Sequence, residues 1–222
     1  MAARMLSDRA ALALLMGVLA AYNVVRSAWL PDGVHLLANV AMAGVVVAIA
    51  RAAGVGRIEL RLARHHVAAG VRLGMVALAA IAVIVTLAAL VAEPVDLAGS
   101  MIDLSMAEMW WRVLVAIPLG TVLLEELAFR GVLAALFVRL LSARQALWYG
   151  AGVFGLWHIA PALSDDRGSG WTAVVATVIG TAAAGAAFEW LARRSRSLLA
   201  PTIAHWATNG LSLLIVWTVA QR

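Results

Sequence analysis

The sequence predicts an all-α, polytopic membrane protein with about seven transmembrane helices and a polar site inside the bundle. Of its 222 residues, 64% are hydrophobic and only 13% are charged, against about 45–50% and about 25% in soluble domains. A water-soluble fold of this length could not bury so many apolar side chains in one core. This excludes a soluble enzyme, and the lack of any Cys excludes an extracellular disulfide scaffold.

Seven segments are apolar enough to cross a bilayer, which takes about 20 residues of helix. We predict spans at Ala10–Arg26, Val34–Ala50, Val71–Ala92, Val113–Val138, Gln145–Ala160, Trp171–Leu191 and Leu198–Val219. The fifth is the shortest and the fourth the longest. No clear repeat relates the segments and no linker is long enough to separate two domains. Residues 1–222 are therefore predicted to form a single integral membrane domain.

The basic residues, all of them arginine, indicate the orientation of these spans. If the N-terminus is cytosolic, twelve arginines fall on the cytosolic side: Arg4, Arg9, Arg51, Arg57, Arg61, Arg64, Arg72, Arg139, Arg144, Arg193, Arg194 and Arg196. Arg26, Arg112, Arg167 and Arg222 fall on the opposite side, and Arg130 lies within a span. This is the positive-inside distribution. The net charge of +5 is thus a topology signal, and no nucleic acid is expected as a partner.

Most acidic residues outside the spans complement this orientation, because seven of them gather on the non-cytosolic side: Asp32, Glu93, Asp96, Asp103, Glu108, Asp165 and Asp166. Glu189 is different, since it lies near the cytosolic end of the sixth segment and is expected to reach the interface. The compact, Ala-rich, all-Arg chain indicates a bacterial plasma-membrane protein with a cytosolic N-terminus.

Five ionisable residues lie well inside predicted spans: Glu125, Glu126, Arg130, His158 and His205. Charges in such positions are costly and mark candidate functional sites. By the helical rise of about 1.5 Å per residue, Glu125 and both histidines fall within about two turns of the membrane midplane. We therefore expect these groups to meet.

The fourth segment contains two adjacent glutamates followed by an arginine. Glu126 and Arg130 stand at i and i+4, which allows them to pair along one face of a helix. Glu125 points about 100° away and lacks that partner. An unpaired carboxylate in an apolar setting suits a general base. A purely structural role for the Glu126–Arg130 pair remains open, but it does not account for Glu125.

The fifth and seventh segments add two histidines. Phe154 and His158 share a helical face at i, i+4, as do His205 and Asn209. A single intramembrane histidine is usually a packing residue, whereas two of them with an asparagine and an unpaired glutamate favour a site. Trp157 and Trp206 adjoin these histidines and, unlike the other tryptophans, do not fall near predicted helix ends.

The motifs of several intramembrane proteases are absent. The chain has no HExxH, GxSG or GxGD pattern, and no Cys or Ser lies within the polar constellation, so a covalent nucleophile is not favoured. The chemistry left is activation of water by a carboxylate with histidine assistance, or by a metal held by glutamate and histidine.

These residues resemble the CPBP family, which comprises CAAX proteases and bacteriocin-processing enzymes and is also called Abi. The family is marked by EExxxR, FxxxH and HxxxN on successive transmembrane helices. Here they read Glu125-Glu126 to Arg130, Phe154 to His158, and His205 to Asn209. Each motif alone is weak, but three in order are specific. The resemblance covers residues 110–215, which it identifies as a CPBP-like catalytic core.

The resemblance implies a role for each matched position. Glu125 would be the general base, His158 its partner in activating water, and His205 and Asn209 would stabilise the oxyanion. The remaining positions would support the site or contact substrate: Glu126, Arg130 and Phe154. The family is commonly described as metalloproteases, so Glu125, His158 and His205 would form a His₂Glu site if a zinc-like divalent metal is used. The glutamate–histidine mechanism needs no metal, and we favour that version.

The implied function is an intramembrane endopeptidase that hydrolyses a peptide bond of a membrane-associated protein or peptide, of the CAAX or the bacteriocin- and regulator-processing type. One alternative is a small transporter or channel with an intramembrane Glu/Arg/His relay, although no two related halves are found. Another is a catalytically silent immunity or assembly factor, although every motif position is filled. The bilayer and a membrane substrate are the expected partners; substrate identity and oligomeric state stay open.

Overall fold

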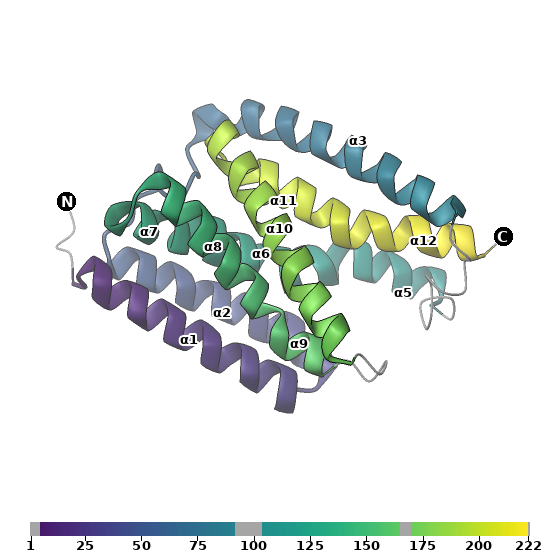
Figure 1. Cartoon of the computed structure of the whole chain (residues 1–222), viewed down its shortest axis with the longest axis horizontal. Coiled ribbons are helices and arrows are strands. Elements are labelled where there is room, and N and C mark those ends of the chain that lie inside the picture. Colours follow the sequence, from purple (N-terminus) through teal and green to yellow (C-terminus); the bar gives the residue numbers. More distant parts are fainter. Residues whose placement is uncertain (1–4, 92–103, 165–169, 222) are drawn as a thin grey trace.

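In a computed structural model of the chain, residues 5–91, 104–164 and 170–221 are described, and within these ranges all regular elements are helices (Figure 1). Five helical runs are long and apolar enough to cross a membrane: Asp8–Trp29 (α1), Asp32–Ala52 (α2), Arg64–Val91 (mostly α3, Val67–Val91), Trp171–Ser195 (α10) and Leu199–Ala220 (α11 and α12). This confirms the predicted helical membrane protein.

Several charges used above to predict orientation lie outside the described residues: Arg4, Glu93, Asp96, Asp103, Asp165, Asp166, Arg167 and Arg222.

The helices are arranged as two outer groups with the site-bearing helices between them (Figure 1). The α1–α2 pair lies on one side, and α3 lies along α11 and α12 on the other. The helices between them are α6 (Leu123–Glu125), α7 (Ala134–Leu140), α8 (Ala143–Trp157) and α10. Helix α8 packs along α10, which in turn contacts α11. This arrangement brings all three motif-bearing segments together.

The predicted fourth span lies inside a longer helical run, residues 106–140, that begins with α5 (Met106–Trp111). A capping box formed by Ser105 and Glu108 starts the run. Three stretches of it are widened into π-helix: Arg112–Ala116, Pro118–Val122 and Glu126–Leu133. Pro118 contributes to this irregularity because it has no N–H and its ring clashes with the preceding turn.

Each widened stretch has a backbone carbonyl that accepts a hydrogen bond from a side chain elsewhere in the fold. The Trp206 indole N–H donates to the carbonyl of Val113 (2.8 Å), and Asn39 Nδ2 donates to that of Gly120. Arg61 Nη1 donates to the carbonyl of Arg130 (3.1 Å). Because unpaired backbone groups are costly in a membrane, these donors stabilise the widened turns.

The predicted fifth span is helical but is interrupted at His158, where α8 gives way to the short helix α9 (Ile159–Leu163). Pro161 explains the break, since it cannot donate to the carbonyl of Trp157 four residues earlier and its ring clashes with that carbonyl. Asn23 Nδ2 donates to this carbonyl instead (2.6 Å). The break leaves His158 at the junction between two helices.

Helices α8 and α10 approach closely at Gly155. A Cβ at this position would lie 2.7 Å from the carbonyl oxygen of Val178 and 2.9 Å from the Cβ of Ala182. Gly150 of the same helix has open space around it. At position 155, therefore, only glycine permits this close approach of the two helices.

We expect Gly155→Ala to destabilise the protein by about 1–3 kcal/mol, because the added methyl group must push the α10 backbone away. Gly150→Ala is the matched control, and it should be neutral or stabilising by up to about 1 kcal/mol, since glycine costs stability in a helix interior. The free energy of unfolding of both variants in detergent micelles measures the difference. Equal stability of the two variants would contradict the close packing.

Candidate active site

The adjacent carboxylates Glu125 and Glu126 are buried at the junction of α6 and the π-helical stretch that follows it. Their residues are 6% and 2% exposed. Glu126 Oε1 accepts a hydrogen bond from Arg130 Nη1 at 3.1 Å. The i, i+4 ion pair predicted from the sequence is therefore present, and both of its side chains are buried.

Aromatic rings enclose the Arg130 guanidinium. Its central carbon lies 3.9 Å from the ring centroid of Phe154 on α8 and 5.1 Å from that of Phe188 on α10. The face of an aromatic ring attracts a cation, and more strongly when water is excluded. Rings from two helices and the Glu126 carboxylate thus compensate for the burial of this charge.

His205 of α11 lies between the two carboxylates. Its Nδ1 is 2.8 Å from Glu126 Oε1 and its Nε2 is 3.7 Å from Glu125 Oε2. Because Glu126 can only accept when ionised, Nδ1 carries the proton and Nε2 faces Glu125. The imidazole stacks on Phe188, with centroids 5.1 Å apart and planes inclined by 24°. The ring is held by both a carboxylate and an aromatic face.

The two oxygens of Glu125 have different surroundings. Oε1 accepts a hydrogen bond from the indole N–H of Trp157 at 3.1 Å. Oε2 is buried and has no hydrogen-bond partner in the described part of the chain. Buried polar atoms in native proteins are nearly always satisfied, so this oxygen, like Oε2 of Glu126, needs an explanation, and a catalytic role is one. Trp157 therefore holds one oxygen of Glu125 in place, and the other oxygen is available to accept a proton.

His158 lies at the break after α8 and is partly exposed. Its Nδ1 donates to the carbonyl of Phe154 at 2.8 Å, which leaves Nε2 as the acceptor nitrogen of a neutral imidazole. The Phe154 ring packs edge-on against His158, with centroids 4.8 Å apart, and against His205, at 6.0 Å. Phe154 is therefore in contact with both histidines.

Asn209 lies in the π-helical stretch Ala207–Leu211, between α11 and α12. It is partly exposed, and its Oδ1 accepts a long hydrogen bond from the Thr208 hydroxyl at 3.4 Å. Among the described residues, no hydrogen bond joins Asn209 to the glutamates or histidines of the site. Of the predicted set, it is the residue least engaged with the others.

The residues do not come together as a metal centre. In the described ranges, no three His, Asp or Glu side chains are grouped so that they could hold a metal ion. Glu125, His158 and His205 are thus not grouped for metal binding in this arrangement, and the conditional His₂Glu site stays a prediction. The physical reason is that the Phe154 ring packs against both imidazoles, while His205 is engaged with the two glutamates.

Two residues of the site were missed by reasoning from the sequence. Trp157 holds Glu125, and the signal for it was present, since a tryptophan within a span and away from the interface needs a polar partner. Phe188 stacks on His205 and approaches Arg130. Nothing in its local sequence distinguishes it from other apolar residues of the sixth segment.

Comparison with protein families identifies the region that carries this site. Residues 107–211 match the family described as Rce1-like, type II CAAX prenyl endopeptidase. This match, over slightly less than half of the chain, supports the resemblance to CPBP-type intramembrane proteases that the sequence motifs predicted. The matched range contains all of the predicted motif residues and, in addition, Trp157 and Phe188. Searches of the curated proteins and of the solved structures found no match.

The buried Glu126–Arg130 pair should be a major source of stability. We expect Arg130→Met to cost about 3–5 kcal/mol, because it leaves a buried carboxylate without its counter-charge. Arg144→Met is the control, since Arg144 is exposed and surface changes stay within about 0.5 kcal/mol. The free energy of unfolding in detergent tests this. A loss for Arg130→Met as small as that of the control would show that the pair is not energetically important.

Proposed function

We propose that this chain is a protease that hydrolyses a peptide bond of a membrane-associated protein or peptide with water activated by Glu125. The observation that carries the proposal is the asymmetric setting of Glu125. Trp157 holds Oε1, while Oε2 is buried, unpartnered and 3.7 Å from an imidazole nitrogen. This geometry supports a general base that is oriented at one oxygen and reactive at the other.

In the proposed reaction, Glu125 Oε2 removes a proton from a water molecule as the water oxygen attacks the carbonyl carbon of the substrate. The C–N bond then breaks, and the proton is delivered to the departing amine nitrogen, so a carboxylic acid and an amine are released. His158 would assist as the partner of Glu125, because Nδ1 donates to the carbonyl of Phe154 and Nε2 is free to take up a proton.

His205 and Asn209 would stabilise the oxyanion of the tetrahedral intermediate. An imidazolium at His205 donates from Nδ1 to Glu126 and presents its Nε2–H to developing negative charge. Glu126 orients the imidazole through Nδ1, while Arg130 holds the Glu126 carboxylate in place. Donors positioned in advance, in a site poor in water, are among the strongest contributions to catalysis. Asn209 would turn its amide toward the same oxyanion when substrate is bound.

For the setting of this reaction, we infer a bacterial plasma membrane with the N-terminus in the cytosol. The inference rests on the arginine distribution. It is supported by contacts that bring arginine-rich junctions to one end of the bundle: Arg139 donates to the carbonyls of Ala53 and Gly54, and Arg193 to that of Ala143. In such a membrane, bacteriocin-like peptides, anchored regulators or surface-protein precursors are better substrate candidates than prenylated tails.

We expect Glu125→Gln to lower peptide hydrolysis by a factor of about 10²–10⁴, the usual contribution of a general base. The variant keeps an oxygen to accept from Trp157, so it should remain folded in the membrane. Quantitative peptidomics of membranes from cells that produce wild type or variant would reveal the substrate, and cleavage by the purified proteins would give the rates.

Two further variants serve this comparison. His158→Asn should show a comparable loss, because it removes the partner of Glu125. Glu108→Gln should retain full activity, since Glu108 is exposed and glutamine preserves its capping box with Ser105. Full activity of Glu125→Gln would overturn the assignment and favour a transporter or an inactive assembly factor.

We expect hydrolysis to withstand chelation, because the described donors are not grouped as a metal site. The purified protease, incubated with EDTA or 1,10-phenanthroline and then freed of chelator, should keep its rate. Its metal content, measured by mass spectrometry, should be well below one ion per chain. Loss of activity that returns on adding zinc would instead support the His₂Glu arrangement.

A further inference from the structure

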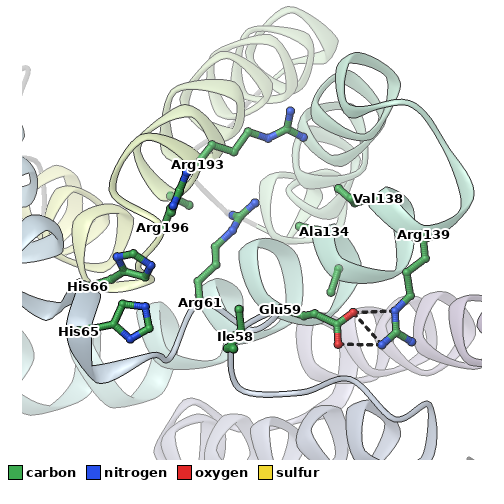
Figure 2. Close-up of a pocket in the computed structure, with 12 residues that line it drawn as sticks. Ile58, Glu59, Arg61, His65, His66, Ala134, Val138, Arg139, Arg193 and Arg196 are labelled. Carbon is green, nitrogen blue, oxygen red and sulfur yellow. Dashed lines mark hydrogen bonds and ion pairs between the residues drawn. The ribbon is translucent and has the colours of Figure 1, made fainter.

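A second polar region lies away from the candidate active site, at the end of the bundle where the arginine-rich junctions meet. It is a pocket of about 550 Å³. Its walls come from the loop after α2, the short helix Arg64–His66, helix α7 and the C-terminal end of α10. Figure 2 shows Arg61 projecting into its centre, with Arg196 and two histidines on one side and the Glu59–Arg139 ion pair on the other.

Positive charge dominates the lining of this pocket. Arginines at positions 61, 139, 193 and 196 contribute to it, whereas Glu59 is the acidic residue among its lining side chains. Most of this charge is compensated within the protein. Arg139 bonds to Glu59 and Asp8, and the carboxylate of Glu189 bonds to both Arg61 and Arg193.

Glu189 lies behind this pocket and is buried within the protein. It is only 5% exposed, and its carboxylate lies 2.7 Å from Arg61 Nη2 and 2.6 Å from Arg193 Nε. Its burial anchors the two arginines that form the inner wall of the pocket. They are thereby held in fixed positions without a ligand.

Some arginine groups of the pocket are left without an acidic partner and could bind an anion. In the part of the chain that the structure describes, Arg196 has no hydrogen bond or ion pair, and Arg193 Nη2 is buried without a partner. Arg196 therefore has no acidic partner there, and Arg61 and Arg193 share the one carboxylate of Glu189. His65 and His66 stand beside it as additional hydrogen-bond donors (Figure 2).

The rim of the pocket is apolar. Ile58 is 76% exposed and Val138 is 51% exposed, and both line the pocket. The pocket thus combines a basic interior with exposed aliphatic side chains at the end of a membrane bundle. Basic pockets between transmembrane helices at the cytoplasmic surface are suited to lipid headgroups.

We propose that this pocket binds the phosphodiester of an anionic phospholipid, with Arg196 as its main ligand and the acyl chains against the apolar rim. A phosphodiester carries one negative charge, which suits Arg196, the lining arginine that has no acidic partner among the described residues. Free phosphate at neutral pH carries more charge and has no apolar part, so it fits less well. This proposal is independent of proteolysis and holds equally for a Glu125→Gln chain.

The test measures lipid binding to the full-length chain in detergent micelles by native mass spectrometry, with dioleoylphosphatidylglycerol as the probe. Dioleoylphosphatidylcholine, which has the same chains and no net charge, and inorganic phosphate are the comparison ligands. We expect the anionic lipid to bind most tightly. Equal binding of phosphatidylcholine would overturn the proposal, and equal binding of inorganic phosphate would overturn the assignment to a lipid.

A matched pair of variants distinguishes specific binding in this pocket from general attraction of anionic lipid to surface arginines. We expect Arg196→Gln to weaken binding of the anionic lipid about tenfold or more, the effect of losing a hydrogen bond to a charged group. Arg194→Gln removes the same charge two residues away, outside this pocket, and should change binding by no more than about fivefold, the usual contribution of one basic residue near a membrane surface. Arg196→Lys should retain most of the binding. Equal losses for the Arg194 and Arg196 glutamine variants would refute the site.

Discussion

The rest of the site depends on one constraint, which is that Glu126 and Arg130 are charged and buried in a membrane protein. An ion pair alone seldom repays the desolvation of its two partners. Here the chain supplies further compensation from three other helices. His205 of α11 bonds to Glu126, and Phe154 of α8 and Phe188 of α10 place their rings over Arg130. The pair therefore draws together the same helices that carry the other candidate catalytic residues.

The helices around this pair are irregular, and the backbone carbonyls at their irregular turns accept hydrogen bonds from side chains of other segments. The run of residues 106–140 is widened three times, and α8 is broken before Pro161. At each place a side chain from a distant segment satisfies a backbone carbonyl, as Arg61 does for Arg130 and Asn23 for Trp157. In a membrane no water is available for this purpose. The distortions that orient Glu125 and His158 thus require a correctly packed bundle.

Arg61 connects the two polar regions of the molecule. One of its nitrogens, Nη1, donates both to the carbonyl of Arg130, beneath the candidate active site, and to Glu189, which lies behind the basic pocket. The second nitrogen, Nη2, also bonds to Glu189. The candidate catalytic helix and the end of the bundle are in this way joined by a single, partly buried side chain. Glu189, which the sequence placed at the interface, is part of that connection.

The sequence by itself determined what depends on composition and on spacing within one helix. The apolar composition determined the membrane class, the arginine positions predict the orientation, and the i, i+4 spacing predicted the Glu126–Arg130 pair. All seven predicted segments are helical where the structure describes them, apart from residues at their ends and at the break at His158.

Only the tertiary structure decided the contacts between segments. Trp157 on Glu125, His205 between two carboxylates and Phe154 against both histidines join residues on different helices. Such contacts depend on how the helices pack, and packing brings together residues whose distance along the chain carries no local pattern.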